Sequence, residues 1–170
     1  MQDEPVLGPE LDVSLVTESA DGTVAECIHD LVTQEPFAVL CTQGEGQPYG
    51  SVVAFAFDHD LRSFVFATPR ATRKFRLLSQ CNRVALVVDN RGRFPEDLMK
   101  VGAVTITGKA QQLEPGPEFD KWARLLMARH PYLGSFVMSP STALFRVVAI
   151  RFLHVTRFQE VRQWIPASVG

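Results

Sequence analysis

The sequence lacks any apolar run that approaches the length needed to span a membrane. Residues Met1 to Pro5 are acidic and show neither the basic nor the apolar region of a secretory signal. The cysteines are few: Cys27, Cys41 and Cys81 are an odd number without metal-ligand spacing, and we expect them to be buried thiols. These absences predict a cytoplasmic protein in a reducing compartment, with no membrane partner.

Common functional motifs are also missing. There is no phosphate-binding P-loop and no G-x-G-x-x-G, which excludes the usual mononucleotide and dinucleotide folds. The G-x-S-x-G elbow of serine hydrolases is absent. The formal net charge is −2, without the overall positive bias of a nucleic-acid-binding domain, so we expect no nucleic-acid partner.

The four histidines are scattered and form neither H-E-x-x-H nor a cysteine–histidine cluster, which argues against a structural metal. His59 lies between two aspartates in a predicted turn and is expected to face solvent. His130 follows a predicted helix, where a cation interacts favourably with the helix dipole. His154 lies on a predicted strand, and the sequence leaves open which face of the sheet its side chain occupies. His29 carries no further signal, and a haem-ligating role for any of the four is a minor alternative.

The chain has 170 residues, of which 46% are hydrophobic, and this suits one domain with a substantial core. Residues 1–22 are acidic and contain glycine and proline, which predicts an N-terminal arm that lies on a partner subunit. Residues 23–170 show no internal repeat and no linker to a second domain. We therefore expect a single domain over 23–170.

Apolar and alternating segments predict a mainly β protein with a few flanking helices. The first predicted strand is apolar enough to be buried on both faces, and Gly108 is expected to form a β-bulge. Short strands at regular spacing favour a barrel or a sandwich. The expected strands are Phe37–Cys41, Tyr49–Phe57, Phe64–Ala67, Arg83–Asp89, Val101–Leu113 and Ala143–Phe158; the expected helices are Ala25–Val32, a segment that begins near Ala71 or Thr72, and Phe119–Met127.

The most informative stretch runs from Phe64 to Leu78 and predicts a strand, a tight turn and the start of a helix. Four cations crowd the first turn of this helix, where the dipole favours negative charge. A bound phosphate would resolve the conflict, because it accepts bonds from free backbone N–H groups and pairs with cations. A solvated basic helix face explains the composition equally well. The cations are Arg70, Arg73, Lys74 and Arg76.

Over about residues 24 to 158, the sequence resembles the pyridoxamine 5′-phosphate oxidase-like family of flavin-binding split barrels. The most specific part is the T-x-x-x-[ST]-R-K arrangement over Thr68 to Lys74. The resemblance implies a six-stranded antiparallel split β-barrel that forms a homodimer, with two FMN molecules at the subunit interface. It rests on five segments: Gly50–Phe55, Phe66–Thr68, Thr72–Lys74, Arg83–Val87 and Thr105–Ala110.

The resemblance also implies where this chain would contact FMN. Thr72, Arg73 and Lys74 correspond to the residues that bind the phosphate, in agreement with the independent argument from the helix start. Ala67 and Thr68 correspond to a strand end that passes the ribityl chain or the isoalloxazine ring.

A second strand is implied to line the polar edge of the flavin ring through its backbone, at Ser51, Val52 and Val53. Backbone N–H and C=O groups suit that edge because they require no particular side chain. Plain core packing is the alternative explanation for these three residues.

The expected function is that of a flavin-dependent oxidoreductase acting on a small molecule, with no catalytic side chain assigned. Positions Gly50 to Phe55 are neutral or apolar here, where the vitamin-processing oxidase has basic residues, so the substrate is left unassigned. The alternatives are a haem-binding or haem-degrading split barrel, and a non-enzymatic flavin-binding protein. Trp164 is expected to pack in the fold, with stacking on a flavin of the other subunit as the alternative.

Overall fold

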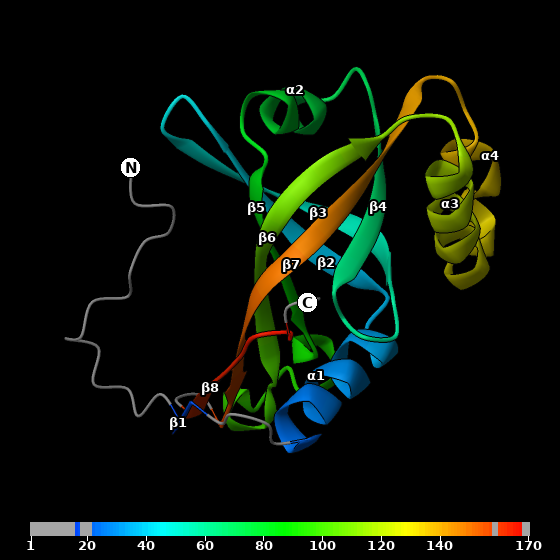
Figure 1. Ribbon diagram of the computed structural model, residues 1–170. Helices are drawn as coiled ribbons and strands as arrows, with labels where there is room; N and C mark the ends of the chain where they lie inside the picture. Colours follow the sequence, from blue (N-terminus) through cyan, green and yellow to red (C-terminus); the bar gives the residue numbers. More distant parts are fainter. Residues whose placement is uncertain (1–15, 18–21, 158–159, 168–170) are drawn as a thin grey trace.

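The computed structural model of the chain describes residues 16–17, 22–157 and 160–167 (Figure 1). Six antiparallel strands follow one another in the spatial order β7-β4-β3-β2-β5-β6, and a further pairing of β6 with β7 closes them into a barrel. The barrel strands are β2 (Phe37–Gly44), β3 (Gln47–Phe57), β4 (Ser63–Pro69), β5 (Arg83–Asp89), β6 (Ala103–Leu113) and β7 (Thr142–Thr156). The predicted six-stranded split barrel is confirmed.

A small extension continues the sheet beyond the barrel and was not predicted. Strand β8 (Glu160–Trp164) pairs antiparallel with β7, and β1 (Val16–Thr17) pairs parallel with β8. Trp164 packs on Phe152, with ring centres 5.0 Å apart, as its packing interpretation predicts. Most of the predicted arm over 1–22 lies outside the described residues, so its placement stays a prediction.

Helices cover both ends and one side of the barrel (Figure 1). Helix α1 (Gly22–Gln34) lies across the lower end, and α2 (Arg73–Gln80) lies at the upper end. Helices α3 (Pro117–Arg129) and α4 (Gly134–Val137) pack beside β4. Short 3-10 turns complete the connections: η1 (Arg91–Arg93), η2 (Leu98–Lys100) and η3 (Pro131–Leu133). None of the described helices is long and apolar enough to cross a membrane.

The barrel interior is filled by side chains in register across neighbouring strands. Leu40, Leu86 and Ile106 pair across β2, β5 and β6, and all three are fully buried. A second apolar cluster lies between β4 and α3, where Val65 packs with Trp122 and Leu126. Burying such side chains stabilises the fold by about 1.5–3 kcal/mol each. Strand β4 is therefore buried on both faces, with the barrel core on one side and the helices on the other.

Two expectations about burial are wrong. Strand β2 alternates between core and surface, and Phe37 is 49% exposed, because only one face of β2 meets the barrel interior. The cysteines are not buried thiols: Cys27 of α1 is exposed, and Cys41 and Cys81 are partly exposed. An apolar composition alone did not indicate that β2 has a second, uncovered face.

His130 does not present its side chain at an exposed end of α3. It is the C-terminal cap residue, but its side chain is buried and its Nε2 lies 2.8 Å from the carbonyl oxygen of Phe55, to which it donates. Its neighbour Arg129 instead reaches α1 and donates to the carbonyls of Val32, Thr33 and Glu35, at the C-terminal end of that helix. The end of α3 thus holds α1 and β3 in place.

Candidate functional site

The turn between β4 and α2 is held by two threonine hydroxyls. The Thr72 Oγ1 accepts from the Phe75 amide at 3.2 Å, which makes Thr72 the N-cap of α2. The same hydroxyl donates to the Pro69 carbonyl at 2.9 Å and lies 3.1 Å from the Thr68 hydroxyl. Since Thr72 has one proton, the Thr68 hydroxyl must be the donor in that contact. Thr68 is fully buried, so it fixes the turn from below.

The start of α2 presents positive charge without a counter-charge. Its first turn contains no acidic residue, and Arg73 and Lys74 have no ion-pair partner within the described chain. The Arg73 guanidinium lies over the Tyr49 ring, with its carbon 5.1 Å from the ring centre. Lys74 is half-buried, and this desolvation lowers the pKa of its ammonium group. Sequence reasoning did not identify Tyr49, because its approach depends on how the β2–β3 hairpin leans toward α2.

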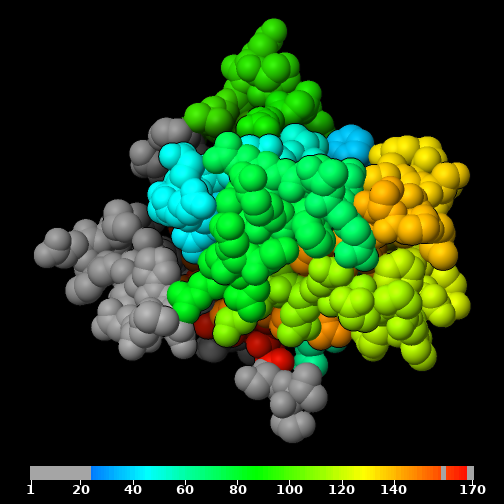
Figure 2. All heavy atoms as spheres, turned by 90° about the horizontal axis from the view of Figure 1, so that it is seen from above, coloured from blue at the N-terminus to red at the C-terminus, as the bar shows by residue number. Residues whose placement is uncertain are grey.

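This cationic turn lies at an accessible end of the barrel. Seen from above, α2 occupies the middle of that end, between the tip of the β2–β3 hairpin and the α3–α4 pair (Figure 2). The amides of Arg73 and Lys74 find no acceptor in the described part of the chain. Two free N–H groups and two cations therefore converge on one surface, which is the arrangement that binds a phosphate.

The barrel opens beside this turn. The described pairing of β3 with β4 ends at Phe55 and Phe66, while β3 stays paired with β2 as far as Gln47 and β4 with β7 as far as Pro69. Past this point each strand has one edge without a strand partner. The site residues assigned to β3 and β4 follow directly on the two separating strands: Ser51, Val52 and Val53 on one, Ala67 and Thr68 on the other.

The side chains along the opening have different surroundings. The Ser51 Oγ is buried and has no hydrogen-bond partner among the described residues, whereas Val53 belongs to the barrel core. Val52 points outward and is 69% exposed. Ala67 packs toward the cluster under α3, so its backbone rather than its methyl group faces the opening. The structure thus brings the predicted residues of β3, β4 and α2 to one end of the barrel.

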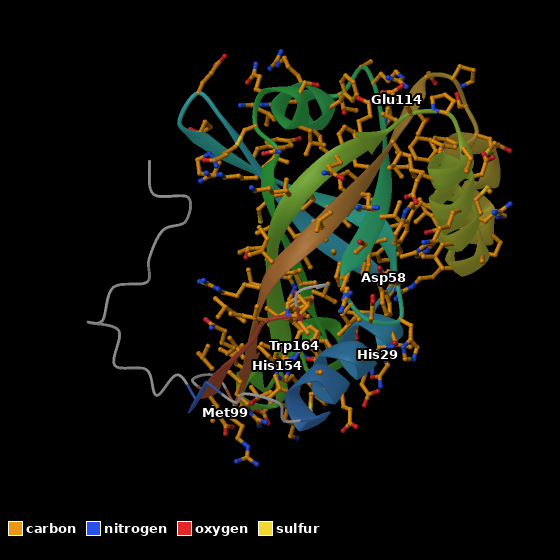
Figure 3. All side chains as sticks on the ribbon, viewed as in Figure 1. His29, Asp58, Met99, Glu114, His154 and Trp164 are labelled. Atoms are coloured by element: carbon orange, nitrogen blue, oxygen red, sulfur yellow. The ribbon has the colours of Figure 1, made fainter. Side chains whose placement is uncertain are left out.

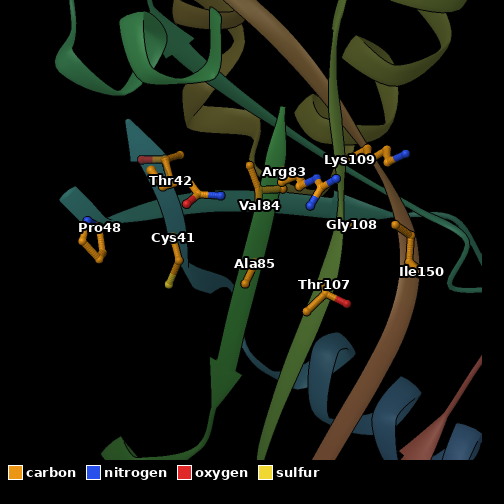
Figure 4. Close-up of a pocket in the computed structure, with 11 residues that line it drawn as sticks. Cys41, Thr42, Pro48, Arg83, Val84, Ala85, Thr107, Gly108, Lys109 and Ile150 are labelled. Carbon is orange, nitrogen blue, oxygen red and sulfur yellow. The ribbon is translucent and has the colours of Figure 1, made fainter. Parts of the chain in front are cut away.

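A cavity of about 330 Å³ lies on the outer face of the sheet (Figure 4). Cys41, Ala85 and Thr107 line it from β2, β5 and β6, where they pair in register and alternate with the buried core row. The Thr107 Oγ1 is buried and has no hydrogen-bond partner within the described chain, and Ile150 of β7 is exposed at the edge of the cavity. Sequence analysis did not predict this concave and mostly apolar outer surface.

The histidines do not form a metal centre. Within the described residues, no group of three or more histidine, cysteine, aspartate or glutamate side chains is arranged to hold a metal ion. His59 is exposed, as predicted, and lies near His29. His154 points into the lower end of the barrel and is buried.

A closed six-stranded antiparallel barrel in which one strand pair separates is a split barrel. A family model described as pyridoxamine 5′-phosphate oxidase matches residues 24–158, and the chain belongs to this family. The match extends from α1 to the end of β7 and thus includes the whole barrel. No curated protein sequence matches the chain significantly.

Solved structures with the same fold are distant in sequence. A haem-binding protein from Mycobacterium smegmatis has a TM-score of 0.76 at 15% identity; the alignment covers 87% of this chain and 60% of that one. A Clostridium acetobutylicum protein related to general stress protein 26 gives 0.66 at 16% identity, covering 86% and 96%. A FAD-binding protein from Mesorhizobium loti gives 0.60 at 16% identity, covering 77% and 90%. These similarities establish the fold, and two of these proteins are described as binding different cofactors, haem and FAD.

Proposed function

We propose that the protein binds FMN, with the phosphate at the N-terminus of α2, and acts as a flavin-dependent oxidoreductase on a small molecule. The main observation in support of this proposal is the uncompensated positive charge of the turn between β4 and α2. Arg73 and Lys74 lack anionic partners in the described chain, their amides are free, and Lys74 is partly desolvated. A terminal phosphate of two negative charges satisfies all of these groups together.

The residues present fit the rest of the cofactor. The open edge of β3 offers backbone donors and acceptors at Ser51 to Val53, and the unpartnered Ser51 hydroxyl adds one more polar group. When bound, the flavin ring would supply hydride or electron transfer. The chain's own residues would anchor the phosphate, orient the ring edge and exclude water from one side of it.

Thr72 would contribute mainly through its backbone position. Its hydroxyl already donates to Pro69 and accepts from Phe75 and Thr68, so it has no spare proton for a phosphate oxygen. A direct hydroxyl contact would require the bond to the Pro69 carbonyl to be given up. We therefore assign the phosphate contacts to the Arg73 and Lys74 amides and side chains, with Thr72 as the residue that positions them.

A homodimer would complete the site. The exposed Val52, the apolar outer cavity and the exposed Ile150 all belong to the outside of the barrel. Apolar surface of this kind is typical of a protein–protein interface. A second copy packed there would cover the open side of the flavin, as the family resemblance implies.

The direct test is cofactor binding by the purified protein. We expect FMN to bind with quenched fluorescence and to bind more tightly than riboflavin, which lacks the phosphate. The double change Arg73→Ala and Lys74→Ala should weaken FMN binding by about 100-fold, since two charge-assisted hydrogen bonds are removed. It should leave riboflavin affinity nearly unchanged. The matched control, Lys121→Ala with Arg124→Ala on the exposed face of α3, should retain FMN binding.

Equal affinity for FMN in the double variant and the control would overturn the phosphate assignment. A Soret band on titration with haem, without FMN binding, would favour the haem-binding alternative that the M. smegmatis neighbour illustrates. Anaerobic bleaching of bound flavin by a nicotinamide cofactor would support an oxidoreductase. Bound FMN that no physiological reductant bleaches would indicate a non-enzymatic flavin binder, and sedimentation measurements would test the dimer.

A further inference from the structure

A separate cavity lies at the lower end of the barrel, away from α2. It has a volume of about 350 Å³, is open to solvent, and is lined by α1, the η2 turn and the end of β7. Figure 3 shows His154 and Met99 together at this end of the molecule, far below the helix that carries Arg73 and Lys74. The proposed flavin site uses none of the lining residues. A cavity of this volume exceeds the space of a single water, about 30 Å³.

His154 provides the first sign of a ligand. Its side chain is only 4% exposed and lines this cavity, and its Nδ1 is buried without a hydrogen-bond partner in the part of the chain that the structure describes. Burial and the nearby Arg162 lower the pKa of His154, with Glu160 opposing them, so the imidazole is neutral near pH 7. A neutral imidazole has one donor and one acceptor. Leaving such a buried group unsatisfied destabilises the folded protein, and a polar ligand would relieve that cost.

Three charged side chains line the same cavity: Asp30, Lys100 and Arg157. Asp30 comes from α1 and Arg157 from the residue after β7. Neither side chain forms an ion pair or a hydrogen bond within the described chain, although other surface charges nearby do so, such as Lys100 with Asp97 at 3.5 Å. The cavity therefore combines a free carboxylate, a free guanidinium and a neutral, unsatisfied imidazole.

We propose that this cavity is a second ligand site, which binds the zwitterion of a small α-amino acid. The ligand's ammonium group would pair with Asp30 and its carboxylate with Arg157, whose planar guanidinium suits a carboxylate. His154 would hydrogen-bond the side chain or carboxylate from the barrel side, and Leu31 and Val101 supply apolar lining for a short side chain. A metal ion is a poorer fit, because no set of three ligating side chains occurs among the described residues.

The test follows the His154 ring by NMR in the full-length protein while L-alanine, L-serine, L-leucine and L-glutamate are titrated separately to 10 mM. We expect at least one of these amino acids to shift the His154 ring signals in a saturable manner. Acetate and methylammonium, which each carry half of the zwitterion, should bind at least tenfold more weakly. Stronger binding of acetate or methylammonium would identify a simple anion or cation site and overturn the proposal, as would the absence of any saturable shift.

Charge variants separate this site from non-specific binding. Asp30→Asn and Arg157→Gln should each raise the Kd of the amino acid by about tenfold or more, the effect of losing a charge-assisted hydrogen bond. The controls Glu26→Gln, on the same helix but outside the cavity, and Arg124→Gln should change it by less than twofold. Unchanged affinity in both cavity variants would overturn the proposal. Because flavin binding is measured separately through its fluorescence, failure here leaves the FMN proposal untouched.

Discussion

The hydroxyl oxygens of Thr68 and Thr72 lie 3.1 Å apart and link the end of strand β4 to the N-cap of helix α2. Thr68 is on a fully buried strand position, whereas Thr72 starts a helix that carries exposed cations. The contact therefore fixes the start of α2, and with it the proposed phosphate site, to the well-packed core. Rigid donors are what a phosphate site requires, since loose ones lose conformational entropy on binding.

Thr72→Ala should destabilise the protein by about 1–2 kcal/mol, because the N-cap and the bond to the Pro69 carbonyl are both lost. Thr72→Ser should recover most of this stability, since serine retains the hydroxyl. Urea denaturation monitored by circular dichroism measures both effects. FMN affinity should fall in the alanine variant and survive in the serine variant; an alanine variant with wild-type stability and FMN affinity would contradict the assigned role.

Lys74→Met should raise the melting temperature of the flavin-free protein. Desolvation lowers the pKa of Lys74 in the folded state, so the charged ammonium group destabilises the folded protein at neutral pH. This penalty is relieved only as the pH rises from the folded-state pKa toward 10.5, the ordinary pKa of the lysine side chain. Methionine keeps much of the packing and removes the charge. Differential scanning calorimetry checks the prediction.

The same Lys74→Met change should weaken FMN binding by about tenfold or more. Stability and binding would then move in opposite directions, which is expected where a site is strained for function. Arg76→Met, at an exposed position of the same helix, serves as the control and should change neither quantity appreciably. A Lys74 variant that loses both stability and flavin would indicate a purely structural lysine.

Gly108→Ala should destabilise the barrel by about 1–3 kcal/mol, the usual effect of overpacking. A Cβ at Gly108 would lie 2.5 Å from the Val148 carbonyl oxygen and 2.8 Å from Val147 Cγ1. The register of β6 and β7 shifts between Thr107 and Gly108, and the missing side chain lets the strands approach there. Gly92→Ala, which meets no atom within 4 Å, should be nearly neutral in the same thermal denaturation experiment.

His154 should make the protein less stable at acidic pH. Its pKa is lowered in the folded state, so the neutral form contributes stability that is complete above the ordinary value of 6.5 and lost as the pH falls through the folded-state pKa. One proton corresponds to a slope of up to about 1.4 kcal/mol per pH unit. His154→Leu should flatten the dependence of the unfolding free energy on pH as the pH falls below 6.5.

His59→Leu removes an exposed histidine and should preserve that slope, which makes it the control for His154→Leu. The leucine at 154 should also raise the stability at neutral pH, because it removes a buried nitrogen without a partner. Identical pH profiles for the two variants would show that His154 does not couple folding to protons.

Much of the fold could be predicted from local patterns in the sequence. Strand β5 was predicted with its observed bounds, and the meander of β2, β3 and β4 followed from turn residues and alternation. The bulge at Gly108 was predicted from glycine in a strand, and the start of α2 from the cluster after Pro69. Strand β8 was missed because it forms only where β7 provides an edge for it.

Only part of the candidate site could be predicted from the sequence. The cationic start of α2 can be read from Arg73 and Lys74 in the sequence, since a helix start has free amides whatever its surroundings. The buried Ser51 hydroxyl cannot, because its lack of a partner depends on the separation of β3 from β4. Asp30 and Arg157 are 127 positions apart in the sequence and line one cavity only because the chain folds.

Sequence alone determined the order of the six barrel strands and of helices α1, α2 and α3, and the excess of positive charge at one turn, because both depend on neighbours within a few positions. The tertiary structure decided which strand edges are left open, which outer face stays apolar and which charges lack partners. These properties depend on barrel closure, which pairs β6 with β7 and brings α1 against the end of β7. Local periodicity carries no information about such long-range contacts, and the ligand sites are built from them.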